Sequence, residues 1–209
     1  MELDQISSVY LTRQNLKLIL GQNRRTLDYR IASLIKKRVL LRLKKGFYLN
    51  LGYFDKSSKQ SQLLEYLGSV MVYPSYLSGE SVLAQRGFLA ESVYGLTYIT
   101  TKKTRRMVTD RGVFVYQKIK TSLFFGFETA KAEEYDYKVA NLAKALFDFF
   151  YLATQKMDKR EMEVFLTDSR FNWEILSKKD RGVFGQIVVR AKVKKMEKMY
   201  GFLKTKGIL

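Results

Sequence analysis

The chain has 209 residues, of which 46% are hydrophobic and 14% aromatic, so it holds enough apolar material for packed cores and is not globally disordered. It has neither cysteine nor histidine, which excludes disulfides, zinc fingers, thiol nucleophiles and imidazole catalysis. Its 38 Lys and Arg against 20 Asp and Glu give a formal charge of +18, which favours partners that carry phosphates.

The sequence predicts a soluble, cytoplasmic protein. Its first residues, MELDQISS, are acidic and polar, whereas a secretory signal begins basic and continues apolar. No stretch reaches the ~18 consecutive apolar residues that a membrane-spanning helix needs.

Residues 1–52 predict a small domain of three helices followed by a hairpin. Helical spacing of Leu3, Ile6 and Tyr10 predicts the first helix. Thr12 is a candidate cap for a second helix over 13–20, which Gly21 ends, and Asn23 for a third. Leu27, Ile31, Leu34 and Ile35 form the apolar stripe of the third helix, and strands over 39–43 and 46–50 follow, joined by the turn Lys44-Lys45-Gly46. This order is typical of a winged helix-turn-helix domain.

The third helix and the hairpin carry the candidate DNA-binding residues. The first turns of a recognition helix reach base edges in the major groove, where arginine pairs with guanine, and a basic wing lies along the backbone. Residues 1–50 hold 11 Lys and Arg against 3 acidic residues, a dense basic patch. The predicted contacts are Asn23, Arg24, Arg25, Thr26, Tyr29 and Arg30 on the helix, with Arg42, Lys44 and Lys45 on the wing.

Residues 53–60, YFDKSSKQ, are polar and predict a linker to a second domain over 60–209. Apolar periodicity predicts a helix over 63–71, a break at Pro74 and a helix from Ser75 or Ser78 to Gly87. Strands are expected over 93–101, 113–120 and 123–127, and helices over 142–150 and 162–166, with one final basic helix from about Lys179 to Leu203. The predicted fold class is α+β: a winged helix-turn-helix, then a small, mostly antiparallel sheet with several C-terminal helices.

No residue pattern predicts an enzyme, a cofactor or a metal site. Glu133, Glu134 and Asp136 are expected in one solvated loop, and Asp148 is expected to bind a backbone group or an arginine inside a helix. The segment Gly126–Lys131 lacks the second glycine and the Lys-Ser/Thr ending of a phosphate-binding loop. The basic run 102–106 and the Lys-rich last helix are open to two interpretations, a solvated face or contact with a polyanion.

The run from Leu11 to Asn50, LTRQNLKLILGQNRRTLDYRIASLIKKRVLLRLKKGFYLN, resembles the N-terminal winged helix of the AbiEi family of antitoxins. YPSYLSGESVLAQRGFL (73–89), the strands flanking TTKKTRR, and VANLAKALFDFFYL (139–152) resemble later segments of that family, in the same order. One departure is Asn141-Leu142-Ala143, where the family often has a charged residue with proline.

The resemblance implies a transcriptional autorepressor that binds inverted repeats of double-stranded DNA in its own promoter. It also implies an antitoxin that counters a co-encoded nucleotidyltransferase toxin without a stable complex. Two alternatives remain open: a winged-helix regulator whose second domain senses a ligand, with no toxin partner, and a nucleic-acid-processing enzyme that uses the acidic loop.

Overall fold

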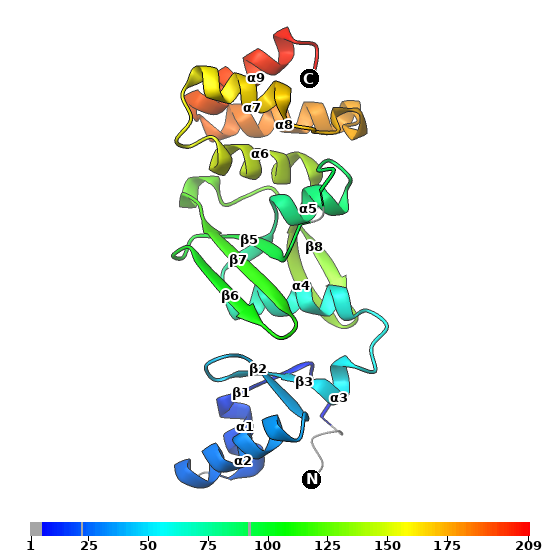
Figure 1. Ribbon diagram of the computed structural model, residues 1–209, viewed down its shortest axis with the longest axis vertical. Helices are drawn as coiled ribbons and strands as arrows, with labels where there is room; N and C mark the ends of the chain where they lie inside the picture. The colour runs from blue at the N-terminus through cyan, green and yellow to red at the C-terminus, as the bar shows by residue number, and fades with distance from the viewer. Residues whose placement is uncertain (1–5, 22, 92) are drawn as a thin grey trace.

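The structure is a computed structural model that describes residues 6–21, 23–91 and 93–209. The chain has an α+β fold with a small antiparallel sheet near the N-terminus and a larger mixed sheet. Figure 1 shows an elongated molecule with the N-terminal part at one end and the last helices at the other. None of the helices in the described ranges combines the length and apolarity needed to cross a bilayer.

The N-terminal part is a three-stranded antiparallel sheet in the order β1-β3-β2 with two helices packed on it. Its elements are β1 (Tyr10–Thr12), α1 (Arg13–Leu20), α2 (Arg24–Lys36), β2 (Leu40–Lys44) and β3 (Phe47–Asn50). The helices predicted over 13–20 and after Asn23 and the two hairpin strands are confirmed. The first predicted helix is wrong from Ile6 onward, because residues 6–8 are irregular and Tyr10 pairs with Leu49 in the sheet; Leu3 lies outside the described residues.

Residues 53–60, expected as a linker, pack closely on the rest of the molecule. The short α3 (Leu51–Phe54) buries Phe54, and the turn after it leads directly into α4 (Gln60–Met71). Aromatic rings also join the two parts, since the ring of Tyr10 in β1 lies 6.2 Å from that of Tyr66 in α4, measured between centroids. The division into domains 1–52 and 60–209 stays a prediction.

The second sheet has six strands in the order β6-β7-β5-β4-β9-β8. Its strands are β4 (Ser75–Leu77), β5 (Leu96–Thr100), β6 (Arg105–Thr109), β7 (Gly112–Lys118), β8 (Phe127–Ala132) and β9 (Tyr135–Ala140). Two of its five pairings are parallel, β4 with β9 and β5 with β7. The other three pairings are antiparallel, as expected for most of the sheet, but the sheet is larger than the small one expected and is mixed.

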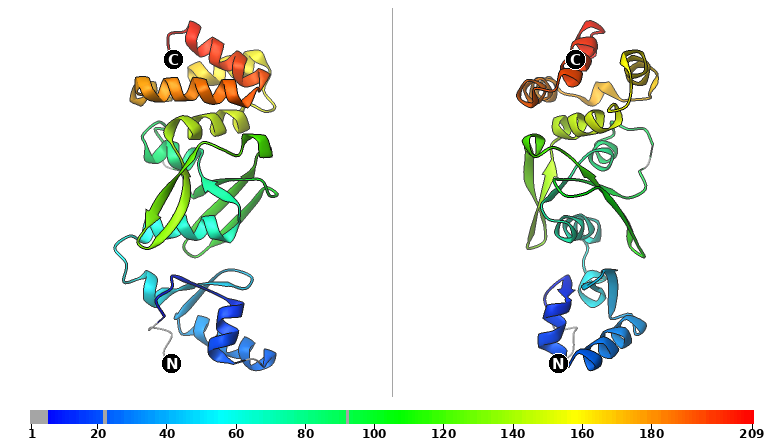
Figure 2. Two further views of the ribbon diagram at one scale, coloured as in Figure 1. Left: turned by 180° about the vertical axis from the view of Figure 1, so that it is seen from behind. Right: turned by 90° about the vertical axis from the view of Figure 1, so that its left-hand side faces the viewer.

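Helices cover both faces of this sheet. Alternate residues of a strand point to opposite faces, and Tyr98 donates a hydrogen bond to the Glu65 carbonyl of α4, whereas Tyr76 donates to Asp148 of α6 (Leu142–Ala153). The helix α5 (Glu80–Gln85) packs against α6. Figures 1 and 2 show α4 on the side of the N-terminal part and α6 on the opposite side.

The last helices stack beyond α6. They are α7 (Lys159–Asp168), α8 (Lys178–Ala191) and α9 (Lys194–Thr205), with α8 against α6 and α9 against both α7 and α8. The single basic helix expected after Lys179 is wrong: Lys192 takes a left-handed conformation, at φ 51°, and divides it into α8 and α9. The expected strand over 123–127 is also wrong, because residues 121–123 form a 3-10 turn and β8 begins at Phe127.

Two groups of buried apolar residues stabilise the fold. The larger spans both sheets and takes in Val9, Leu43, Phe47 and Leu49 from the N-terminal part. The smaller lies under α1 and α2, and its buried members in the described chain are Leu11, Leu16, Leu27, Ile31, Leu40 and Tyr48. The N-terminal part thus shares much of its interior with the rest of the molecule.

Candidate nucleic-acid interface

Local capping contacts fix the positions of α1 and α2. The Thr12 hydroxyl accepts from the Asn15 amide at 3.2 Å, and the Asn15 side chain accepts from the Thr12 amide at 2.9 Å. Gly21 ends α1 at φ 111°, a conformation that disfavours residues with a Cβ. The Asn23 side chain then accepts from the amides of Arg25 and Thr26, at 3.1 and 3.3 Å, and so begins α2.

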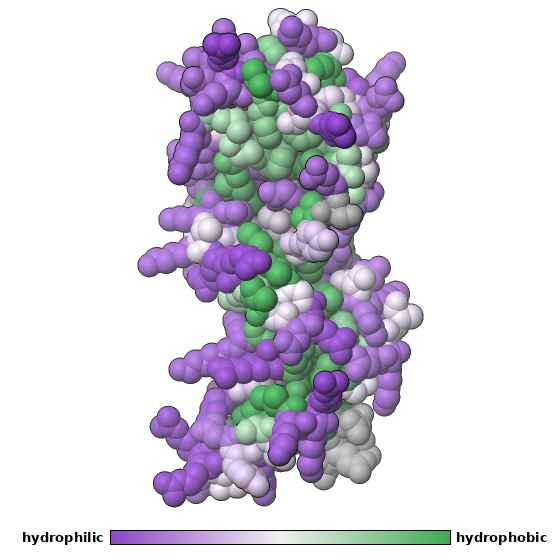
Figure 3. Space-filling view, in the orientation of Figure 1, coloured by the Kyte–Doolittle hydropathy of each residue, from purple (hydrophilic) through white to green (hydrophobic). Residues whose placement is uncertain are grey.

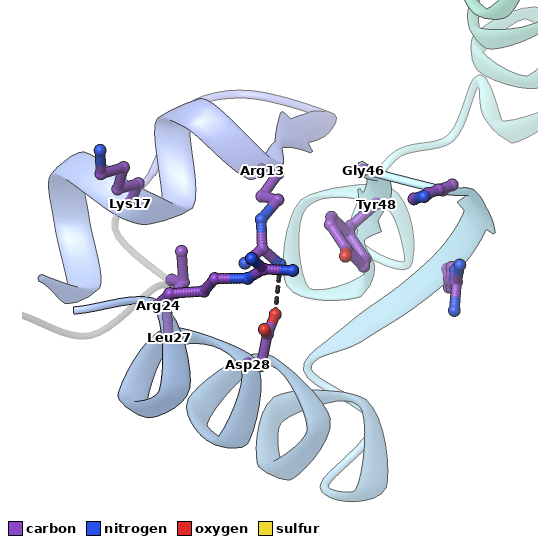
Figure 4. A pocket seen from close by; sticks show the side chains of 9 residues that line it. Arg13, Lys17, Arg24, Leu27, Asp28, Gly46 and Tyr48 are labelled. Carbon is purple, nitrogen blue, oxygen red and sulfur yellow. Dashed lines mark hydrogen bonds and ion pairs between the residues drawn. The ribbon is translucent and has the colours of Figure 1, made fainter. Parts of the chain in front are cut away.

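A basic hollow lies between α1, α2 and the β2–β3 turn (Figure 4). It has a volume of about 550 Å³. Five cationic side chains line it, Arg13, Lys17, Arg24, Arg42 and Lys45, together with Leu27, Asp28, Gly46 and Tyr48. This excess of positive charge in a concave site attracts anions and, most strongly, the closely spaced phosphates of a nucleic acid.

The one carboxylate in the hollow is paired. Arg13 of α1 donates to Asp28 of α2, and this contact holds the pKa of Asp28 below its ordinary value. Both side chains are substantially exposed, so the pair contributes little stability and serves mainly to orient the guanidinium. The remaining cations in the hollow have no carboxylate within 4 Å among the described residues.

Eight of the nine predicted DNA-binding residues fall into three groups. Arg24, Arg42 and Lys45 line the hollow. Asn23, Arg25, Thr26 and Tyr29 are exposed around the first turns of α2. Arg30 is exposed but donates to the Leu20 carbonyl, so its guanidinium also closes the turn between the two helices. Hydrophilic side chains project from this end of the molecule in Figure 3.

Lys44 differs from the other eight predicted DNA-binding residues, because its ammonium group binds a backbone carbonyl and is partly buried. It donates to the carbonyl of Met71, the last residue of α4, and lies 5.5 Å from the Phe47 ring centroid. A cation at the C-terminus of a helix satisfies a free carbonyl and interacts favourably with the helix dipole. Partial burial, and then the nearby charge of Arg105, lower the pKa of Lys44. Lys44 therefore ties the hairpin to α4.

Sequence reasoning missed one set of cations near this surface and placed another in the wrong kind of element. Arg13 and Lys17 lie four residues apart on α1, so they share a helix face, a signal that was available but was considered only for α2. Arg105 and Arg106 were expected in a loop, but they are exposed on the edge strand β6, which contacts β2. The basic surface therefore continues from the hairpin onto the larger sheet.

Glu133 and Glu134, two of the carboxylates considered for catalysis, serve structural contacts. Glu133 and Glu134 form the β8–β9 turn and accept from the Tyr53 hydroxyl at 2.6 and 2.7 Å, and Glu133 also accepts from Ser57. Asp136 is exposed on β9. Within residues 6–21, 23–91 and 93–209, no three acidic side chains cluster closely enough to hold a metal ion.

Asp148 was expected to bind a backbone group or an arginine, but its partners are Lys144, Tyr76 and Ser78. Its carboxylate accepts from the Lys144 ammonium at 2.6 Å, from Tyr76 at 2.9 Å and from Ser78 at 2.8 Å. Both charged groups are fully buried, and desolvation raises the pKa of Asp148 and lowers that of Lys144. This cluster is closed to solvent and belongs to the core.

The sequence matches no model of a known protein family, and a search of curated proteins also found no match.

Proposed function

We propose that the chain is a DNA-binding transcription regulator whose N-terminal part is a winged helix-turn-helix domain. The observation that carries this proposal is the hollow between α1, α2 and the β2–β3 turn, with its five cations and single, paired carboxylate. The strand–helix–helix–hairpin order supports it, since that order places a second helix beside a basic wing.

In this proposal α2 enters the major groove of duplex DNA. Arg25, Thr26 and Tyr29 are exposed on its first turns and free of intramolecular side-chain bonds among the described residues, so they are the candidates for base edges. Arg13, Lys17, Arg24, Arg42 and Lys45 would hold phosphates on either side of the helix. Arg30 would position α2 through the Leu20 carbonyl.

The second sheet would extend the interface along the DNA backbone. Arg105 and Arg106 are exposed on β6, and β6 contacts β2 of the hairpin. Phosphate contacts carry affinity and its salt dependence, while base contacts carry sequence preference. The full chain is therefore expected to bind with a steeper salt dependence than the N-terminal surface alone would give.

We further propose, from the resemblance to the AbiEi family, that the regulated promoter is the chain's own and that the rest of the chain counters a nucleotidyltransferase toxin. The binding site would be an inverted repeat, which suits two copies of a helix-turn-helix protein. This part of the proposal depends on the resemblance, whereas DNA binding depends on the charged hollow.

The test is selection of bound sequences from random duplexes by the full chain, followed by affinity measurements on the selected site. Arg25→Ala should cost about 1–3 kcal/mol on that site and relax preference at one position. Selection that yields no preferred sequence, or an Arg25→Ala variant with unchanged preference, would refute sequence-specific binding through α2.

A promoter reporter and a growth assay test the antitoxin role. The reading frame beside the gene should encode a nucleotidyltransferase whose expression arrests growth, and the chain should restore that growth. Failure of rescue with intact promoter repression would leave a DNA-binding regulator and refute the antitoxin role.

A further inference from the structure

A second dense positive region lies at the end of the molecule opposite the N-terminal part. Residues 178–209 contain ten Lys and Arg against two acidic residues, Asp180 and Glu197. Residues 51–177 are almost balanced, with 17 Lys and Arg against 15 acidic residues. Figures 1 and 2 place α8 and α9 at the far end of the long axis from α1 and α2.

Half of these ten cations are used within the fold, and three of them, Arg190, Lys204 and Lys206, lie over aromatic rings. Arg181 donates to the carbonyls of Trp173 and Leu176, and Lys195 donates to the carbonyls of Thr154 and Met157. By contrast, Lys178, Lys179, Lys192, Lys194 and Lys198 are exposed. None of the ion pairs found in the described chain involves α8 or α9, so the field of these lysines is directed to solvent.

A hollow between α7 and α9 offers a place for a ligand backbone. It has a volume of about 460 Å³ and is lined by Lys159, Met162, Glu163, Lys198, Gly201, Phe202 and Thr205. Its one carboxylate, Glu163, is paired with Lys159 at 3.8 Å, which leaves Lys198 as the unpaired cation of the hollow among the described residues. Gly201 lies within α9, where glycine destabilises a helix by about 1 kcal/mol relative to alanine. A Cβ at Gly201 would meet nothing within 4 Å, so internal packing does not require glycine there. Close approach of an external partner does give a reason for it.

We propose that the α7–α9 end binds the phosphate backbone of duplex DNA. Single-stranded nucleic acids are usually held by exposed aromatic rings on which bases stack. The strongly exposed aromatic side chains of the described residues are Tyr29, Tyr73 and Tyr94, all outside this end. A surface with exposed lysines and no exposed aromatic rings suits the sugar-phosphate backbone of a duplex, because binding there needs positive charge and no stacking on bases.

This surface faces away from α2, so the duplex that it binds is not the straight segment beneath the N-terminal hollow. The chain would therefore bridge two DNA segments. Bridging rests on the proposed function, whereas binding of DNA at α7–α9 does not.

The test uses the full chain in which Arg25 and the five cations of the N-terminal hollow, Arg13, Lys17, Arg24, Arg42 and Lys45, are all replaced by alanine, which disables the N-terminal surface. The probe is a labelled duplex of arbitrary sequence, titrated at several salt concentrations. This variant should still bind. Adding Lys194→Ala and Lys198→Ala should weaken binding about tenfold and lower the slope of log affinity against log salt by about 2. The matched control, Lys131→Ala with Lys138→Ala on the β8–β9 hairpin, removes the same charge from the middle of the molecule and should change neither quantity.

The variant Gly201→Leu tests whether DNA binding depends on the shape of the hollow as well as on its charge. It puts an apolar side chain into the hollow without altering the charge, and its Cβ meets nothing within 4 Å, so binding should weaken while the melting temperature does not fall. A bridging assay completes the test: wild-type chain on immobilised DNA should retain a second labelled duplex, and Lys194→Ala/Lys198→Ala should lose only the second.

Three results would overturn the inference: no duplex binding once the N-terminal surface is disabled, equal behaviour of the α9 and control variants, or tighter binding of single-stranded RNA than of duplex. Each of them leaves the sequence preference of α2 untouched, so failure here is distinguishable from failure of the proposed function.

Discussion

Lys44 and Lys45 are neighbours in the sequence, but the structure predicts opposite consequences for their replacement. Lys45 is exposed and lines the basic hollow. Lys45→Ala should lower the slope of log affinity against log salt by about 1 and should leave the free energy of unfolding within about 0.5 kcal/mol of wild type.

Lys44→Ala should act on stability instead. It leaves the Met71 carbonyl at the end of α4 without its donor, and loss of a charge-assisted bond at a half-buried site costs about 1–2 kcal/mol. For a chain of this length, each kcal/mol corresponds to about 2–4 °C, so the melting temperature should fall by about 2–8 °C. The salt slope should stay at its wild-type value, because the Lys44 ammonium is bound to the Met71 carbonyl inside the protein.

The assays are scanning calorimetry and anisotropy titrations of the selected duplex over a range of salt, with Lys131→Ala as the control for loss of one exposed charge. A Lys44→Ala variant with an unchanged melting temperature and a lower salt slope would show that Lys44 contacts phosphate. The tie between the hairpin and α4 would then be wrong.

Three further predictions concern the rest of the fold. Asp148→Ala leaves a buried ammonium unpaired and should cost about 3–5 kcal/mol in urea unfolding, while Lys144→Met with Asp148→Leu should recover most of it. Gly68→Ala puts a Cβ into the buried Tyr98 hydroxyl and should lower the free energy of unfolding by about 1–3 kcal/mol. Gly182→Ala on α8 is the control, because its Cβ meets nothing within 4 Å, and it should raise the free energy of unfolding by up to about 1 kcal/mol in the same assay. The hydrogen bond from Tyr53 lowers the pKa of Glu134 in the folded protein. The stability that ionised Glu134 contributes is therefore present above its unfolded pKa and is lost as pH falls through its lower folded pKa. Melting temperatures measured from pH 7 to pH 3 should decline less for Tyr53→Phe than for wild type, and equal declines would contradict this assignment.

The parts of the fold that were predicted from the sequence are those with local signals. Thr12, Gly21 and Asn23 each act on backbone groups within four residues, so the bounds of α1 and α2 could be inferred from residue type and spacing. The same holds for the N-terminal residues that line the hollow on α2 and the hairpin.

The parts that were missed depend on contacts between distant residues. Half of the residues in β8, FETAKA, are polar, and two more are alanines, which are not strong strand formers. The strand pairs with β9 along its whole length, so its own side chains carry little strand signal. The strand β4 has only three residues and lies between β5 and β9. Lys44 and Met71 are 27 residues apart, and no local pattern distinguishes Lys44 from Lys45.

The shared interior described for the N-terminal part has a consequence for how this protein can diversify. An N-terminal part with a hydrophobic core of its own could be exchanged between related proteins by recombination at residue 52. Here Leu43, Phe47 and Leu49 pack into the larger core, and Tyr53 is held by the β8–β9 turn. A chimera cut at residue 52 would pair mismatched surfaces. If α2 binds DNA as we propose, new sequence preference is expected to arise by substitution on the exposed face of α2 while the buried contacts beneath it stay unchanged.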